Sequence, residues 1–302
     1  MTVFFPPGWA VCTSSDAGAT LGCTPASCAG TSVQMSVLLI STGFAALLYL
    51  LSGICIVTAM KKGADAKASS LLRWPVLLGL ILHGYAIQGE MFQSEAVHFG
   101  FGYAVSVMFF FAVIILLIES WVHRLHGQFG IVLIAAAFGA IFPVLFPGNA
   151  LPAADWTPFF RFHLLAALAA YSFMTIALVH AVLMYMQNRH LKEPSEGAGF
   201  IDSLPGLVVM ERIFFRIVAC GFLLLTFVLV SGAWTTKETY GVFFHFDHKM
   251  ILTWISWIVF GILLLGRWLA GWRAKTALRL FWAGFVVFVI AYFGYSFILE
   301  VF

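Results

Sequence analysis

The sequence predicts an all-α integral membrane protein, a bundle of about eight transmembrane helices with its N-terminus and C-terminus outside. The first observation is composition: 62% of the 302 residues are hydrophobic and 10% are charged, whereas about 25% of the residues of a soluble domain are charged. The second is a series of long apolar runs, and the third is the placement of Lys and Arg. Because the sequence lacks the two-residue alternation of membrane strands, a barrel is not expected.

A helix that crosses the ~30 Å hydrocarbon core needs roughly 20 apolar residues. Eight runs approach or exceed this length, at about 33–60, 74–92, 100–121, 130–147, 163–187, 213–233, 249–269 and 280–300. Several connections are short, which makes neighbouring helices antiparallel. The longest connection, 188–212, contains proline, glycine and mixed charge. We expect it to be a loop with a short interfacial turn near its Leu and Val residues.

Residues 1–32 precede the first run and form a Cys-containing external tail, and residues 33–302 form one membrane domain. In an oxidising compartment, the tail cysteines Cys12, Cys23 and Cys28 permit one disulfide and leave one thiol over. The tail has no charged segment followed by an apolar core, so it does not resemble a signal peptide. The chain also lacks the C-x-x-C-H pattern of covalently attached haem.

The orientation follows from Lys and Arg, which are enriched in cytoplasmic loops. Thirteen of the sixteen lie in or beside the connections after the first, third, fifth and seventh runs. Those connections therefore face the cytoplasm, and both termini lie outside. The three exceptions, on outward-facing segments, are Arg161, Lys237 and Lys249. The net charge of +3 implies no nucleic-acid partner, and the expected surroundings of the chain are membrane lipid.

Ionisable residues inside a bilayer are costly and therefore indicate function. His83 lies nine residues from Trp74, or ~14 Å of helix, and His180 lies seven residues before Gln187, or ~10 Å, from the same side. Their similar depth predicts an inner pair that shares a ligand. The alternative for each is a neutral imidazole hydrogen-bonded to a neighbouring helix.

His163 and His248 each lie at the start of a predicted helix on the outer side, so they form a second pair at a similar depth. His163 and His180 are ~26 Å apart along one helix, so they cannot bind one metal. The three outward basic residues all lie near the outer pair. Asp247 or His245 is placed to accept a hydrogen bond from a ligating imidazole.

Two imidazoles on different helices are able to bind haem iron from opposite faces, with aromatic and aliphatic side chains covering the porphyrin. A zinc site needs a third or fourth ligand. Haem also carries two propionates, for which Arg161 and Lys249 are the predicted partners. We therefore expect non-covalent haem b, with iron ligands at His163, His248, His83 and His180.

The chain from about residue 35 to 302 resembles the cytochrome c assembly family of haem-handling membrane proteins, which includes the system II haem exporter and smaller HemX-like and YpjD-like relatives. The residues that carry the resemblance are S-G-A-W at 231–234, G-R-x-x-x-G-W-R at 266–273 and A-Y-F-G at 291–294. The segment 161–185 is similar to the family's helix that begins with an external haem-ligand histidine. The resemblance thus implies that role for His163.

The exporters' haem-presenting motif, W-G-x-Y-W-x-W-D-P-K-E-T, falls on residues 240–250 of this chain. Asp247 and Lys249 match it, whereas His248 stands at the proline, Met250 at the glutamate, and Tyr or Phe at the tryptophans. This pattern resembles the HemX-like or YpjD-like branch. The resemblance implies a multi-pass protein of the bacterial inner membrane that holds or translocates haem, with other cytochrome c maturation proteins as partners and no bond-making chemistry.

Two further classes of function remain open at this point. A b-type cytochrome-like subunit would use two haem sites to pass electrons to quinone, although the sequence has no recognisable flavin, nicotinamide or quinone motif. A non-haem ion or proton transporter would use the histidines with Glu90, Glu95 and Glu119. Haem that is reoxidised by a quinone analogue favours the former, and bound zinc or manganese without iron favours the latter.

Overall fold

The structure is a computed structural model that describes residues 25–61, 71–93, 96–122, 126–146, 149–152, 157–192, 201, 204–241 and 248–291. Eight long helices occupy most of these ranges: α1 (Pro25–Lys61), α3 (Arg73–Met91), α4 (Phe101–Val122), α5 (His126–Leu145), α6 (Pro158–Lys192), α8 (Leu207–Tyr240), α9 (His248–Ala270) and α10 (Ala274–Val289). Within these ranges, five helices are long and apolar enough to cross a membrane. The helical membrane-protein class is confirmed.

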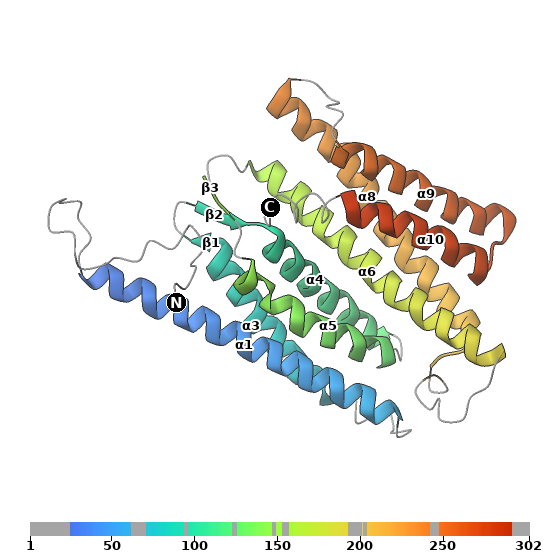
Figure 1. Ribbon diagram of the computed structural model, residues 1–302, viewed down its shortest axis with the longest axis horizontal. Coiled ribbons are helices and arrows are strands. Elements are labelled where there is room, and N and C mark those ends of the chain that lie inside the picture. The colour runs from blue at the N-terminus through green and yellow to red at the C-terminus, as the bar shows by residue number, and fades with distance from the viewer. Residues whose placement is uncertain are drawn as a thin grey trace, which may run out of the picture.

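The helices form two groups joined through α6 (Figure 1). In the first group, α1 packs against α3 and α5, and α4 packs against α3 and α5. In the second, α8 packs against α9, and α9 packs against α10. Helix α6 contacts α4 and α5 on one side and α8 and α10 on the other. Near the start of α6, His163 lies against Ser231 of α8.

Small and aromatic side chains make up the packed interior. Ala112 of α4 and Ala136 and Ala140 of α5 are buried, which lets these helices approach closely. Between α6 and α10, the Tyr171 ring stacks on Phe288 at 4.0 Å, and its hydroxyl donates to the Phe288 carbonyl. Such contacts hold a bundle in lipid, where apolar burial between helices adds little.

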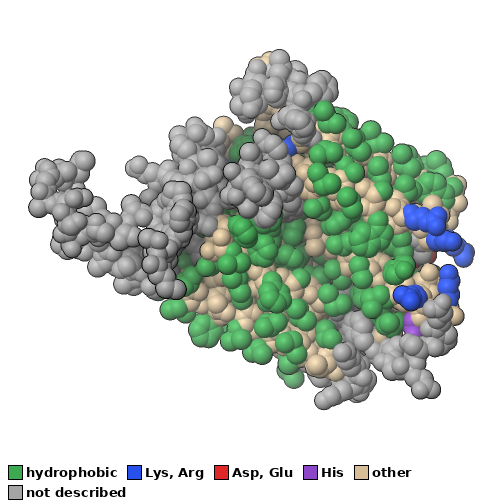
Figure 2. All heavy atoms as spheres, in the orientation of Figure 1, with side chains coloured by type: hydrophobic (Ala, Val, Ile, Leu, Met, Phe, Trp, Pro, Cys, Tyr) green, Lys and Arg blue, Asp and Glu red, His purple; other side chains and the backbone are tan. Residues whose placement is uncertain are grey.

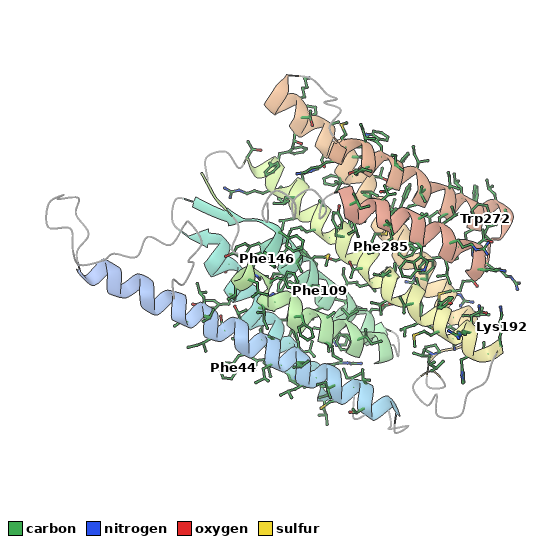
Figure 3. The ribbon with its side chains drawn as sticks, in the orientation of Figure 1. Phe44, Phe109, Phe146, Lys192, Trp272 and Phe285 are labelled. Carbon is green, nitrogen blue, oxygen red and sulfur yellow. The ribbon has the colours of Figure 1, made fainter. Side chains whose placement is uncertain are left out.

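The outer surface of the bundle is largely apolar, as lipid contact requires. Figure 2 shows hydrophobic side chains over the middle of the visible face, and Phe44 projects outward from α1 (Figure 3). Lys and Arg gather at the right-hand end of Figure 2, where α6 and α9 end and α8 and α10 begin. The described basic residues of these helix ends are Arg189, Lys192, Arg212, Arg216, Arg267, Arg273, Lys275 and Arg279.

A small antiparallel sheet, absent from the sequence-based prediction, joins two of the connections. Its strands are β1 (Phe92–Gln93), β2 (Ala96–Phe99) and β3 (Asn149–Pro152), in the order β1-β2-β3. Val97 pairs with Phe92 on one side and with Leu151 on the other. His98, expected in a short loop, therefore lies in the central strand. Strands this short have no pattern that distinguishes them from a turn.

Several helix ends differ from those predicted. Helix α1 begins at Pro25, within the predicted 1–32 tail, and Cys28 is therefore on a helix, while Cys12 and Cys23 lie outside the described residues. The prediction of a loop over 188–212 is wrong at both ends, because α6 continues to Lys192 and α8 begins at Leu207. Apolar length marks the hydrocarbon core, and helices continue past it into water.

The G-R-x-x-x-G-W-R segment forms the end of α9 and the tight turn that follows it. Gly271 has φ +62°, which turns the chain so that the Trp272 N–H donates to the Gly266 carbonyl at 3.2 Å. The Trp272 ring then lies against Gly266, where a Cβ would collide with it. Trp272 and Lys192 both lie at the right-hand end in Figure 3.

Arg267 connects this turn to α8. Its guanidinium pairs with Glu211, donates to the Trp272 carbonyl at 2.9 Å, and lies 4.8 Å from the centre of the Phe215 ring. Glu211 is buried, so the pair satisfies a carboxylate that would otherwise be costly. This family-like segment therefore has a structural role, far along α9 from His248.

Candidate functional site

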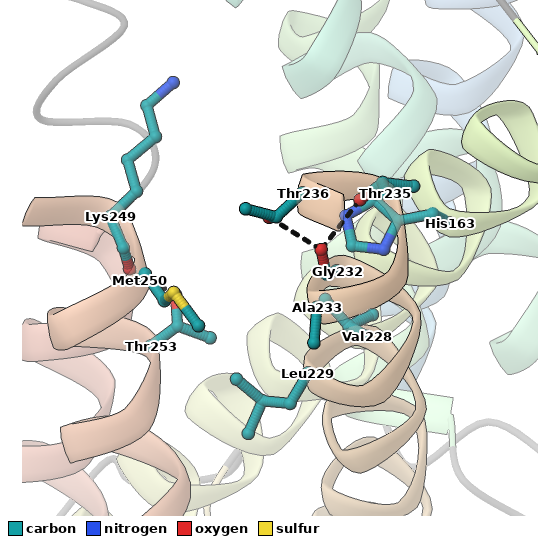
Figure 4. A pocket seen from close by; sticks show the side chains of 10 residues that line it. All are labelled: His163, Val228, Leu229, Gly232, Ala233, Thr235, Thr236, Lys249, Met250 and Thr253. Carbon is teal, nitrogen blue, oxygen red and sulfur yellow. Dashed lines mark hydrogen bonds between the residues drawn. The ribbon is translucent and has the colours of Figure 1, made fainter. Parts of the chain in front are cut away.

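A cavity of about 220 Å³ lies between the N-terminal part of α6, the C-terminal half of α8 and the start of α9. Helix α6 contributes one wall residue, α8 most of the lining, and α9 the remaining wall (Figure 4). The lining residues are His163, Val228, Leu229, Gly232, Ala233, Thr235, Thr236, Lys249, Met250 and Thr253. The imidazole of His163, the thioether of Met250 and the base of the Lys249 side chain line a space that is otherwise aliphatic and hydroxylic, and the Lys249 ammonium points away from it (Figure 4).

The ring of His163 is held by a hydrogen bond across the α6–α8 interface. Its Nδ1 lies 2.8 Å from the hydroxyl oxygen of Ser231, a buried residue. The Ser231 hydroxyl also lies 2.8 Å from the Phe227 carbonyl, to which it donates. A serine hydroxyl has a single hydrogen. Because that hydrogen goes to Phe227, Ser231 accepts a hydrogen bond from His163 Nδ1–H, and the lone pair of the imidazole is on Nε2.

Gly232 lies against the ring of His163. A Cβ at position 232 would lie 3.2 Å from Cε1 of the His163 ring, tighter than ordinary van der Waals contact. The other ring atom within 4.0 Å of that position is Nδ1, so a side chain at 232 would press on the edge of the ring that bonds Ser231. The glycine therefore leaves room for the His163 ring beside α8 (Figure 4). Phe160 supports the other part of the ring by stacking on it at 6.3 Å.

The hydroxyl groups of the lining are directed to their own helices. Thr235 and Thr236 both donate to the Gly232 carbonyl, at 2.9 and 2.8 Å, and Thr253 donates to the Lys249 carbonyl at 2.6 Å. Their oxygen lone pairs are left to accept hydrogen bonds from a ligand. Lys249 supplies positive charge on the α9 side. The rim therefore suits an acidic or polar group, and the aliphatic wall suits an apolar one.

The structure brings two of the predicted outer residues, His163 and Lys249, to one cavity. Arg161 is exposed and is not part of the lining, because residues two apart on a helix point about 200° apart. His248 is the first residue of α9, but its side chain and all of Asp247 and His245 lie outside the described residues. Their predicted roles stay predictions.

The predicted inner residue His83 lies at the contact of α3 with α1 and α4. Its Nε2 is 2.9 Å from the Ser106 hydroxyl, and its ring meets Tyr49 and Phe110 edge-on at 5.8 and 5.6 Å. Its Nδ1 and the Tyr49 hydroxyl are buried and have no hydrogen-bond partner among the described residues. One ring nitrogen is therefore available to a ligand.

The other inner residue, His180, is fully buried on α6. Its Nδ1 lies 3.3 Å from the Ile176 carbonyl, and its Nε2 lacks a partner within the described ranges. Helix α4 packs against both α3 and α6, and no described contact joins His180 to His83. Over the same ranges, no three His, Cys, Asp or Glu side chains gather as a metal site.

The sequence-based reasoning missed Ser231, Gly232 and Met250 as lining or supporting residues. The first two belong to the S-G-A-W segment, which was noted as a mark of resemblance and not as part of a site. Their small, polar character next to an apolar run was the available signal. Met250 has no such signal, because methionine is ordinary in a membrane helix.

Comparison with known proteins then decides the family. Residues 71–302 match the family model described as cytochrome C assembly protein. This chain belongs to that family. The match includes α3 to α10, and so contains all three helices of the cavity.

The similarity to individual relatives covers only part of the chain. The chain is 28% identical to the inner membrane protein YpjD of Escherichia coli K12 over 148 residues, which is 49% of this chain and 55% of that protein. It is 30% identical to a cytochrome c biogenesis protein CcsA of Prochlorococcus marinus over 115 residues, which is 35% of this chain and 36% of that protein. It is also 30% identical to CcsA of Trieres chinensis over 124 residues, 41% of this chain and 39% of that protein. The chain therefore spans about half the length of YpjD and less of each CcsA protein.

Proposed function

We propose that this protein binds haem b non-covalently at the outer cavity and holds or translocates it for cytochrome c maturation or haem homeostasis. The observation that carries the proposal is the state of His163: the side chain lines the cavity, and Nδ1–H is engaged by Ser231, which leaves the lone pair of Nε2 for a ligand. Histidines that bind metals are oriented in the same way, by a hydrogen bond from the second ring nitrogen.

The other lining groups fit the chemistry of haem. Val228, Leu229 and Ala233 offer an apolar wall to a porphyrin, and Lys249 with the threonine hydroxyls offers charge and hydrogen bonds to propionates. The cavity of about 220 Å³ is smaller than the roughly 300–1,000 Å³ of typical ligand pockets. A macrocycle bound here therefore extends beyond the cavity. When bound, haem would supply an iron centre, while this chain would supply the ligands, the apolar cover and the cations.

The membrane topology belongs to the same proposal. Eight crossings with both termini outside would place the ends of α6, α8 and α9 that carry the cavity on the outer side and the basic helix ends on the cytoplasmic side. The bacterial inner membrane is supported by the likeness to YpjD, whose name gives that location. The likeness to CcsA, named for cytochrome c biogenesis, supports other maturation proteins as partners.

The inner histidines remain a separate part of the proposal. His83 and His180 each have a buried ring nitrogen without a partner among the described residues, which supports ligand binding. No described contact joins the two rings, and the proposed function rests on the outer cavity.

A haem titration tests the outer site. Haemin is added to the full-length protein in detergent after removal of haem, and the Soret absorbance is followed for the unaltered protein and the His163→Ala variant. The proposal predicts saturable binding that the substitution weakens by at least tenfold. His190→Ala is the matched control, because His190 is on the same helix at its opposite end. Equal affinity in all three proteins would overturn the proposed role of His163.

A further inference from the structure

We propose that the exposed face of α10 binds one anionic phospholipid, with Lys275 and Arg279 at its phosphate and Trp282 and Val286 along its acyl chains. The inference goes beyond the proposed function and does not rest on it. Lys275 lies where α6 and α9 end and α8 and α10 begin, whereas the outer cavity lies at the opposite ends of α6, α8 and α9. Three observations support the proposal.

The first observation is the arrangement of exposed residues along α10. The side chains exposed on one face of this helix are Lys275, Arg279, Trp282 and Val286. Because the helix advances by about 100° per residue, their spacings of four, three and four residues place them within about 60° of one another. The side chains buried on the opposite side are Ala277, Phe281 and Phe288. A continuous stripe of α10 therefore faces away from the bundle.

The second observation is the order of side chains in this stripe. Two cations come first, an indole ring follows, and an aliphatic side chain comes last. A phospholipid has a matching order of phosphate, interfacial glycerol and acyl chain, and tryptophan is enriched at the interfacial level. From Lys275 to Val286 the helix rises ~16 Å, which fits within the ~20 Å of one leaflet with its headgroups. The stripe is thus long enough for one lipid molecule.

The third observation is the excess of positive charge at this end of the bundle, where Lys and Arg gather in Figure 2. Glu211, the carboxylate at these helix ends among the described residues, is buried and paired with Arg267. Within the same described ranges, neither Lys275 nor Arg279 pairs with a carboxylate. The dipole of α10 also disfavours a cation in its first turn, so Lys275 does not serve to stabilise the helix. The other exposed cations nearby are Arg189, Lys192, Arg212, Arg216 and Arg273.

The apolar part of the stripe distinguishes a lipid from other anions. A soluble anion or an acidic protein segment would engage Lys275 and Arg279 and leave Trp282 and Val286 uncovered. An anionic phospholipid covers all four, because its negative charge is joined directly to hydrocarbon. Basic surfaces at the ends of membrane helices bind anionic lipid headgroups through the same attraction.

The test measures lipid retained by the full-length protein in neutral detergent, by native mass spectrometry, after addition of phosphatidylglycerol or of phosphatidylcholine with the same acyl chains. We expect preferential retention of phosphatidylglycerol, which falls as salt is raised. Lys275→Gln combined with Arg279→Gln should lower the affinity by about tenfold or more, because each cation near a headgroup contributes roughly fivefold. The control pair, Arg189→Gln with Lys192→Gln, removes the same charge from α6 at the same end and should retain the lipid.

A second measurement locates the acyl chains. Bromine on an acyl chain quenches the fluorescence of a tryptophan that it contacts. Phosphatidylglycerol with brominated chains should quench the unaltered protein more than Trp282→Phe. The control is Trp234→Phe, which removes an exposed tryptophan from the other end of the bundle and should leave the quenched signal in place.

Three results would overturn the inference. Equal retention of the two lipids by the unaltered protein is the first. Equal losses in the α10 pair and the α6 pair would indicate general attraction between charges and no site on α10. Complete displacement of phosphatidylglycerol by polyglutamate would indicate an acidic protein segment as the partner. The lipid preference and its salt dependence are measured on the unaltered protein, so the test stays decisive even if a variant does not fold.

Discussion

The hydroxyl oxygen of Ser231 lies 2.8 Å from Nδ1 of His163, across the interface between α8 and α6. This contact links the S-G-A-W segment to the histidine 68 residues earlier in the chain. The same hydroxyl donates to the Phe227 carbonyl at 2.8 Å, which fixes the hydrogen-bond direction and the imidazole tautomer. In the proposed function, Ser231 thus leaves Nε2 of His163 available to iron.

Replacement of Ser231 by alanine should weaken haem binding by about 10–100-fold, the usual effect of losing a residue that orients a metal ligand. Ser231→Thr should retain binding, because a threonine hydroxyl also bonds the carbonyl one turn earlier. Haem titration measures both variants. Ser256→Ala is the control, since the Ser256 hydroxyl is equally buried and donates to the Leu252 carbonyl of its own helix. Full affinity in Ser231→Ala would contradict the assigned tautomer.

A side chain at position 232 should displace the His163 ring. Gly232→Val is predicted to reduce haem affinity more than Gly232→Ala, because even the Ala methyl would lie 3.2 Å from Cε1. Stability should not fall with the alanine, since Gly to Ala favours a helix by about 1 kcal/mol. Gly43→Val, at a site with no atom within 4 Å of a new Cβ, is the control. Equal titration curves for Gly232→Val and the unaltered protein would show that haem affinity does not depend on the position of the His163 ring.

Loss of the Arg267 guanidinium should destabilise the protein and spare the outer site. Arg267→Ala leaves buried Glu211 unpaired and removes the bond to the Trp272 carbonyl. We expect a loss of roughly 1–2 kcal/mol, because hydrogen bonds to charged groups contribute about that much at partly exposed positions. Denaturation in detergent measures the loss, with Arg279→Ala as the exposed control. A change in the haem spectrum without a change in stability would refute the structural role of the G-R-x-x-x-G-W-R segment.

Removal of the inner histidines should leave the outer haem in place. In a His83→Ala, His180→Ala double variant, we expect the His163-dependent Soret band to persist, because neither residue lines the outer cavity. The haem-to-protein ratio is counted in the same samples. A ratio lower than that of the unaltered protein supports the inner station, and an unchanged ratio removes it. Loss of all haem in a variant that still folds would contradict the independence of the two stations.

Sequence reasoning predicts the apolar parts of this fold well. The run at 100–121 corresponds to α4 (Phe101–Val122) and the run at 249–269 to α9 (His248–Ala270). Both helices end where the apolar side chains end. For α8 the prediction of 213–233 is too short at both ends, because the helix continues through Glu211 and Arg212 at one end and through Lys237 at the other. Hydropathy measures contact with lipid and not backbone conformation.

Only part of the candidate site could be predicted from the sequence, because tertiary packing determines the rest. His163 could be predicted because an ionisable side chain in a membrane segment costs free energy, and such residues usually have a function. Met250 does not stand out, because a thioether is apolar and common in helices. Its place in the cavity lining depends on the rotation of α9 against α8, which follows from tertiary packing. The same packing sets the Ser231 contact with His163, and no local pattern contains it.

The most direct test of the central claim is the absorption spectrum of the full-length protein purified from its membrane without added haem, compared with that of His163→Ala. The account predicts a Soret band in the unaltered protein that is lost or strongly reduced in His163→Ala and retained in His190→Ala. A Soret band of equal height in His163→Ala, or no Soret band in the unaltered protein, would contradict it.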